Sequence, residues 1–433
     1  MPDETTDVNL GPGAIAQPSS APASLEELPF DIHRLILSQA PTFDALRALV
    51  HASPQLHRVY VHDRLPLLRD FVEQTFDGFL VDAHAAYLSG TNEFQQSRSD
   101  LTLWEFVNAY RHRLTTLARS DLAAQLPLEH VIELVRFHRS VIEPLTERYA
   151  TWALAALSSS PQNYPLSGTE RRRVQRALYR LEVFCNVCGS RGGGRSAPVC
   201  IGTPVDRLRV LSLIPAWQIE EILCIHAFAK DVYGGIFDQV AWDLDELRNP
   251  KYRHVNMTSV HEDLLLFSSP ECDINQESLD SMLRQGLTLL STVLRITDHK
   301  ELVELVRQSI LGAQWTGRYY DWLDDAVQDG PQATRREEWY SEEDAAQDRR
   351  DKTPFGIDTP DLPPLAWVTF WRGEASNLFG PYVPGTFRRW GYVMWDAARL
   401  EASGAMKYME LESRLDYLGD PREETYLTED SES

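Results

Sequence analysis

Apolar residues recur every three or four positions through most of the 433-residue chain, in segments separated by Gly and Pro. This spacing places them on one face of an α-helix, whereas a half-buried strand would show alternation. The best signal for extended structure is Ala366–Trp371, "AWVTFW", after the Pro-rich stretch "TPDLPP". It predicts a short strand or an extended loop. Because no repeat of about 20–50 residues is present, solenoid and propeller arrays are not supported. We expect a mostly α fold.

The pattern near the N-terminus, over residues 25–77, predicts three short helices followed by a longer one. Pro29 and Asp31 suit the first turn of the first helix. Ser53 suits the N-cap of the third helix, with Pro54 at its first helical position. One face of the first helix collects Leu28, Ile32, Leu35 and Ile36. The second helix, starting near Thr42, groups Leu46, Leu49 and Val50.

Residues 25–77 resemble an F-box, a module of three helices that begins with Leu-Pro and docks an aliphatic face on the adaptor protein Skp1. The ending "ALVHASPQLHRVY" lacks the Trp that commonly closes an F-box and is similar to divergent F-box-like proteins of filamentous fungi. Three later stretches are also similar to those proteins: "ERRRVQRALYRLEVFCNVCG", "PAWQIEEILCIHAF" and "RRWGYVMWDAARLEASG". The matching residues, which the resemblance implies would bind a Skp1-type partner, are Leu28, Pro29, Ile32, Ile36, Leu37, Leu46, Leu49 and Val50.

The resemblance implies a non-catalytic adaptor, the substrate receptor of a Skp1–cullin–F-box ubiquitin ligase, which holds Skp1 and presents an unidentified client protein. One alternative is a helical scaffold that does not bind Skp1. A weaker alternative is an all-α enzyme that depends on Mg²⁺.

The predicted organisation is an N-terminal F-box-like module followed by a larger irregular helical domain. The start of the chain is acidic and rich in Pro and Ser, which is typical of a disordered arm. The polar stretch before "AWVTFW" is typical of a linker or long loop. We expect an arm at 1–24, the F-box-like module at 25–77, the helical domain at 78–328, an acidic linker or long loop at 329–364, an aromatic segment at 365–420 packed on the helical domain, and an acidic tail at 421–433.

Charge narrows the classes of partner. The chain carries 42 basic and 64 acidic residues, a formal net charge of −22. This sign repels nucleic acid and anionic lipid, so we expect neither as a partner. No apolar run reaches the ~18 residues that a spanning helix needs, and the N-terminus lacks a signal peptide. Five cysteines at irregular spacing fit a reducing compartment, so we expect an intracellular protein, cytoplasmic or nuclear.

Two groups of residues raise the question of metal binding. Cys185 and Cys188 form C-x-x-C, but a zinc site usually needs a second such pair. Their spacing continues an apolar helical face, which favours buried cysteines. Asp321, Asp324 and Asp325 lie on one helical turn, where carboxylates could hold Mg²⁺, although exposed surface acids are the better interpretation. We predict no catalytic residues, no metal and no cofactor.

Residues 167–188 predict a long helix. Ser167 and Glu170 form an S-x-x-E capping box at its start, and the helix should run to about Cys188. Five arginines should make its outer side basic: Arg171, Arg172, Arg173, Arg176 and Arg180. One interpretation is a clamp for an acidic peptide or phosphate. We favour the other, in which the arginines form a solvated helix face or ion pairs with the protein's own acidic residues.

Aromatic residues gather before and after residues 329–364. They could line a peptide-binding groove, but a core that joins the C-terminal segment to the helices is the better interpretation. The set comprises Trp315, Tyr319, Tyr320, Trp322, Trp367, Trp371, Phe379, Tyr382, Trp390 and Trp395.

Overall fold

The computed structural model describes residues 25–116, 119–157, 165–189, 203–244, 274–311, 322–409 and 420–424. These ranges are mostly helical, which confirms the predicted fold class, and they contain no strand beyond one isolated bridge between Lys352 and Glu374. Within the described ranges, no helix combines the length and the apolar character needed to cross a membrane. The chain divides into two compact units, the first ending at Phe71 and the second beginning at Val72.

The smaller unit is built from short helices that pack on one another. The N-cap of α3 forms as predicted, because the Ser53 side chain accepts hydrogen bonds from the backbone N–H groups of Gln55 and Leu56. Its elements are η1 (Leu25–Glu27), α1 (Phe30–Ser38), α2 (Phe43–Ala52), α3 (Pro54–His62) and the first part of α4 (Arg64–Thr75). Its apolar core comprises Leu37, Phe43, Leu46, Val50, Leu56, Val59, Leu67, Leu68 and Phe71.

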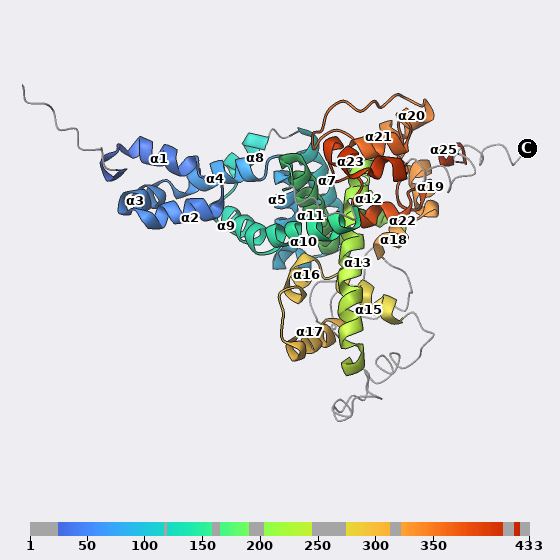
Figure 1. The fold of residues 1–433 in the computed structure, drawn as a ribbon, viewed down its shortest axis with the longest axis horizontal. Coiled ribbons are helices and arrows are strands. Elements are labelled where there is room, and N and C mark those ends of the chain that lie inside the picture. Colours follow the sequence, from blue (N-terminus) through green and yellow to red (C-terminus); the bar gives the residue numbers. More distant parts are fainter. Residues whose placement is uncertain are drawn as a thin grey trace, which may run out of the picture. The chain divides into compact units, whose positions relative to one another are not determined.

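The larger unit contains helices of very different lengths, from one turn to the 29 residues of α13. Figure 1 labels most of them. Its first half comprises α5 (Leu80–Gly90), α6 (Asn92–Gln96), α7 (Asp100–Thr116), α8 (Arg119–Gln125), α9 (Leu128–Phe137), the π-helical turn η2 (His138–Ile142), α10 (Glu143–Leu157), α11 (Gly168–Cys188), α12 (Pro204–Leu211) and α13 (Ala216–Leu244). Its second half comprises α15 (Ile274–Leu283), α16 (Leu287–Val293), α17 (His299–Leu311), α18 (Trp322–Ala326), α19 (Asp329–Glu338), α20 (Glu342–Asp348), α21 (Leu365–Phe370), η5 (Gly380–Tyr382), α22 (Gly385–Arg389), α23 (Ala397–Ser403) and α25 (Pro421–Glu424).

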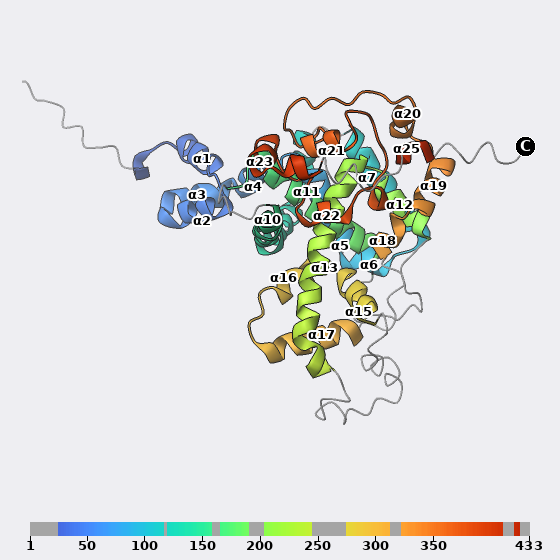
Figure 2. The same cartoon turned by 45° about the vertical axis from the view of Figure 1, so that its right-hand side comes forward.

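The central helix of the larger unit is α11. The predicted capping box is present, since Ser167 and Glu170 exchange side-chain to backbone hydrogen bonds, and the helix ends at Cys188 as expected. It packs against both α5 and α13, so nearly every residue from Arg173 onward is buried. The long helix α13 then passes through the unit, with α11 and α22 packed along its first half and α15 and α17 along its second (Figures 1 and 2).

Two predictions of local structure are wrong. Ala366–Trp371 is neither a strand nor a loop, because Leu365–Phe370 forms α21 after Pro364. The stretch 329–364 is not a continuous linker, because it contains α19 and α20. Helix α20 begins with its own capping box between Ser341 and Asp344, and the Arg335 guanidinium of α19 pairs with Asp344 through two hydrogen bonds. The rest of the stretch, residues 351–364, forms neither helix nor strand, and we call it the strap.

The aromatic residues of the C-terminal part form a core, as predicted. Six members of the set are buried: Trp322, Trp367, Trp371, Phe379, Trp390 and Trp395. The Trp322 ring stacks on Phe184 of α11, and the Trp395 ring lies nearly parallel to Tyr149 of α10. These contacts attach the C-terminal helices to α10 and α11. Trp315, Tyr319 and Tyr320 lie outside the described residues.

We predict that His138 gives the larger unit a pH-dependent stability. The imidazole is enclosed by Phe76, Phe79 and Tyr179, whose hydroxyl lies 3.1 Å from its Nδ1. Burial, with a smaller contribution from Arg171, lowers the pKa of His138 from 6.5 to about 3. As pH falls below 6.5 the unfolded chain binds the proton first, so stability present above that pH is lost progressively towards pH 3.

The substitution His138→Phe should remove this dependence while keeping an aromatic ring in the cluster. Between pH 7 and pH 5 the free energy of unfolding of the wild type should fall by about 2 kcal/mol more than that of the variant. Urea titrations followed by circular dichroism at pH 7, 6 and 5 measure the difference. Parallel pH curves for the two proteins would contradict the assignment.

Candidate functional site

The smaller unit leaves one side of α1 uncovered. Ile32 and Leu35 are 41% and 55% exposed, and Leu28 and Ile36 are half-buried. We call these four residues the α1 face. Helical spacing places Ile32, Leu35 and Ile36 on the side of α1 opposite the buried His33 and Leu37, and Leu28 lies two residues before the helix begins. An apolar stripe of this kind is a candidate docking surface.

The predicted partner-binding set is only partly at the surface. Leu37, Leu46 and Val50 are buried among the helices of the smaller unit, so their role is to form its core and not to contact a partner directly. Leu49 is half-buried and Pro29 is exposed. Leu35, the most exposed residue of the α1 face, is absent from the predicted set although the sequence places it on the same face. For α1, the spacing of apolar residues along the helix therefore predicts which side chains are exposed better than the resemblance to an F-box does.

Polar contacts hold α1 in its orientation within the smaller unit. The ring Nε2 of His33 lies 2.7 Å from the Leu25 carbonyl oxygen, which ties η1 to α1. On the other side Arg34 pairs with Asp63 at 3.2 Å, and the Phe30 ring meets the edge of His62. These contacts lie on the sides of α1 that face η1 and α3. The residues of the α1 face take no part in them, so a partner could bind that face without breaking them.

In the larger unit, three of the five predicted surface arginines are interior residues. Arg173, Arg176 and Arg180 are 0%, 2% and 8% exposed, and we call them the α11 arginine row. The expectation of an outer basic side is wrong for these three, because α11 is enclosed by α5, α13 and the C-terminal segment. Arg171 and Arg172 are half-exposed and pair with Glu147 and Asp77. All five arginines therefore form ion pairs with the protein's own carboxylates.

Each member of the α11 arginine row meets a carboxylate from a different part of the chain. Arg176 donates two hydrogen bonds to Glu221 of α13, at 2.7 and 3.1 Å. Arg180 donates to Asp82 of α5 at 2.9 Å. Arg173 donates to Asp396, which precedes α23, at 3.1 Å. Fork-shaped guanidinium groups suit such pairing because each offers several donors in one plane.

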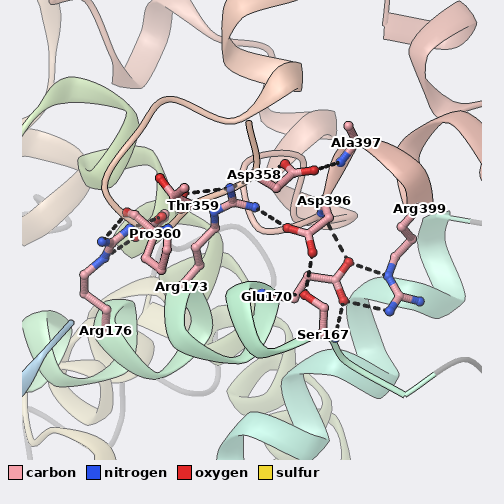
Figure 3. Close-up of polar contacts among 11 residues, drawn as sticks. Ser167, Glu170, Arg173, Arg176, Asp358, Thr359, Pro360, Asp396, Ala397 and Arg399 are labelled. Atoms are coloured by element: carbon pink, nitrogen blue, oxygen red, sulfur yellow. Dashed lines mark hydrogen bonds and ion pairs between the residues drawn. The ribbon is translucent and has the colours of Figure 1, made fainter. Parts of the chain in front are cut away.

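The same arginines hold the strap. Arg173 donates to the carbonyl oxygen of Thr359 at 3.1 Å, and Arg176 donates to that of Pro360. Figure 3 shows both side chains reaching from α11 to these carbonyls. Beside them, Arg399 of α23 pairs with both oxygens of Glu170 at 2.7 Å. The start of α11 is thereby joined to the strap and to α23.

Burial shapes the electrostatics of this cluster. It raises the pKa of Glu221 and lowers the pKa of Arg176, and in each case the ion pair between them acts in the opposite direction. Paired carboxylates and guanidinium groups enclosed by protein neither reach a substrate nor exchange protons readily with solvent. The α11 arginine row therefore has the properties of a structural clasp, and a clamp for an acidic ligand is not supported.

The cysteines and acids considered as metal ligands have other roles. Cys185 and Cys188 are buried on α11, as predicted, and form no disulfide, and burial raises the pKa of Cys185. Asp324 pairs with Lys230 at 2.6 Å, and Asp325 lies 4.0 Å from Arg207. Asp321 lies outside the described residues. Among the side chains that the structure describes, no group of three or more potential ligands could hold a metal ion.

We predict that breaking the pair between Arg176 and Glu221 strongly destabilises the larger unit. Arg176→Met leaves a buried carboxylate without its guanidinium and should cost about 3–5 kcal/mol. Replacing both residues, Arg176→Met with Glu221→Leu, should restore most of that loss because no unpaired charge remains. Arg171→Met is the matched control on the same helix. Its pair with Glu147 is largely exposed, so the loss should stay below about 1 kcal/mol.

Chemical denaturation of the four proteins measures these differences. Equal losses for Arg176→Met and Arg171→Met would contradict a structural role for the α11 arginine row. So would a double variant that is less stable than Arg176→Met.

No family model matches the chain, and neither a curated protein nor a solved structure matches it.

Proposed function

We propose that the protein is a non-catalytic adaptor that holds a Skp1-type protein through the α1 face of its smaller unit. In this proposal the larger unit presents a client protein, as the substrate receptor of a Skp1–cullin–F-box ubiquitin ligase does. Ubiquitin transfer would be performed by other subunits. The resemblance of residues 25–77 to an F-box supplies the identity of the partner.

The observation that carries the proposal is the exposure of the α1 face on a unit that already has a core. Leu37, Leu46 and Leu56 lie in that core, whereas Ile32 and Leu35 of α1 remain outside it. Keeping Ile32 and Leu35 in water forgoes about 25 cal/mol for each Å² of apolar surface that could be buried. A partner that covers the face recovers this free energy.

Two further features support an intracellular adaptor. The described cysteines Cys185, Cys188 and Cys224 are buried and form no disulfide, which suits a reducing compartment. The charged groups of the α11 arginine row are engaged in internal pairs and are unsuited to catalysis. The proposal therefore assigns no catalytic residue, metal or cofactor to the chain and places it in the cytoplasm or nucleus.

We predict that charge introduced on the α1 face abolishes binding of purified Skp1. Ile32→Asp and Leu35→Asp should each weaken binding at least about 30-fold, as expected when a central apolar contact is lost. Both side chains are exposed, so the variants should fold. Val61→Asp is the matched control, because Val61 is a 62% exposed aliphatic residue of α3 that lies outside the α1 face.

Calorimetric titration of Skp1 into the full chain measures the affinities, and circular dichroism checks the fold of each variant. Binding by the wild type and by Val61→Asp, but by neither α1 variant, is the expected result. A folded wild type that does not bind Skp1 would overturn the proposal in favour of a helical scaffold. Equal loss in all three variants would show that the α1 face is not the docking surface.

A further inference from the structure

A cavity of about 410 Å³ lies within the larger unit, between the first half of α13, the end of α18 and the loop that leads into α22. This volume is in the range of small-molecule sites, about 300–1,000 Å³. Its apolar wall comprises Leu223, Ala227, Val327, Pro381, Val383 and Pro384. Its charged side chains are Lys230, Asp324 and Arg388, with His226 beside them. Such a mixture of aliphatic wall and few polar groups is typical of ligand sites.

The loop that forms one wall is held rigidly. Arg388 pairs with both oxygens of Glu220 at 2.8 and 2.9 Å and also donates to the carbonyl oxygens of Gly380 and Val383. The Gly380 N–H donates to the same carboxylate at 2.8 Å. Gly380 has φ +71°, and a Cβ there would lie 2.6 Å from the Val327 carbonyl oxygen, so glycine is required. A wall fixed in this way keeps its shape before a ligand arrives.

Lys230 and Asp324 form the polar side of the cavity and reach solvent. Their side chains are 29% and 41% exposed, and Lys230 Nζ lies 2.6 Å from Asp324 Oδ2. His226, one turn before Lys230 on α13, places its Nδ1 3.5 Å from Asp324 Oδ1. Glu220, in contrast, is fully buried and saturated by Arg388 and Gly380. A ligand in the cavity therefore meets one reachable ammonium and one reachable carboxylate.

The balance of charge decides which ligand suits this pair. A simple anion would approach Lys230 but would also face the Asp324 carboxylate, and the acidic protein repels it at long range. A simple cation would approach Asp324 but would face Lys230 and Arg388. A zwitterion offers a carboxylate to Lys230 and an ammonium to Asp324 at the same time. Each charge then keeps an opposite partner, which avoids the cost of an unpaired charge away from water.

We propose that this cavity binds a free amino acid with an aliphatic or aromatic side chain. The ligand's carboxylate accepts from Lys230, its ammonium donates to Asp324, and its side chain lies against the wall formed by Leu223, Val327 and Pro384. The site uses no residue of the α1 face, so it is independent of the proposed Skp1 binding.

Calorimetric titration of the full chain with leucine, isoleucine, valine, methionine and phenylalanine tests the proposal. At least one should bind. For the amino acid that binds most tightly, the N-acetyl derivative lacks the ammonium and the amide derivative lacks the carboxylate. Each derivative should bind at least about 10-fold more weakly, because each loses one charge-assisted hydrogen-bonded contact.

Substitutions connect the binding to the cavity. Lys230→Met and Asp324→Asn should each weaken amino-acid binding at least about 10-fold without changing the circular dichroism spectrum. Lys352→Met is the matched control, because Lys352 forms a similar ion pair at 2.7 Å with Glu374 outside the cavity. It should leave amino-acid binding unchanged.

Three results would overturn the proposal. The first is that none of the five amino acids binds the folded wild type. The second is that the N-acetyl or amide derivative binds as tightly as its parent, which would mean that the site does not read a zwitterion. The third is that Lys230→Met and Asp324→Asn bind like Lys352→Met, which would place the ligand elsewhere. None of these results depends on whether Skp1 binds.

Discussion

The larger unit depends on the burial of three guanidinium groups on one helix. Each has lost its water and is stable in the interior only if a carboxylate is held at the correct distance. Asp82 comes from α5, Glu221 from α13 and Asp396 from the turn before α23, so one helix fixes three distant parts of the chain. Apolar packing would tolerate small shifts of these elements, whereas a bidentate pair such as Arg176 with Glu221 does not.

This arrangement limits where function can reside. Arg180 also donates to the Gln218 side chain, and Asp82 also accepts from Tyr110, so these charged groups are engaged with one another in the interior. The described residues also offer an apolar side of α1 on the smaller unit and an ion pair, Lys230 with Asp324, that reaches both a cavity and solvent. The two candidate sites are thus places where burial is incomplete.

Local features of the sequence predict local structure well. The Ser53 cap, the capping box of Ser167 and Glu170, and the burial of Cys185 and Cys188 all depend on residues within a few positions of each other. The helix α20 is missing from the prediction although Ser341 and Asp344 carry the same type of signal, because the acidic composition of 329–364 suggests a linker. Capping is the more reliable signal there than composition.

Tertiary contacts could not be predicted in the same way. Arginines at every third or fourth position indicate an exposed side of a helix only if no carboxylates from distant segments pair with them in the folded chain. The partners of Arg176, Arg180 and Arg173 lie 45, 98 and 223 positions away. Helical spacing puts Arg171 on another side of α11 from these three, but it does not say which side the rest of the chain covers. The cavity is equally non-local, since its residues come from three separate segments.

Charge is spread unevenly within the smaller unit. Residues 25–71 carry six acidic and five basic side chains, a balance of −1, whereas the whole chain carries −22. The rest of the unit's charge comes from Asp3, Glu4 and Asp7, so the unit Met1–Phe71 as a whole carries −4. The helices that carry the α1 face are therefore nearly balanced in charge, although the unit and the chain are acidic. Balanced charge beside an apolar stripe adds little electrostatic resistance to hydrophobic association, which is a condition that the proposed docking surface requires.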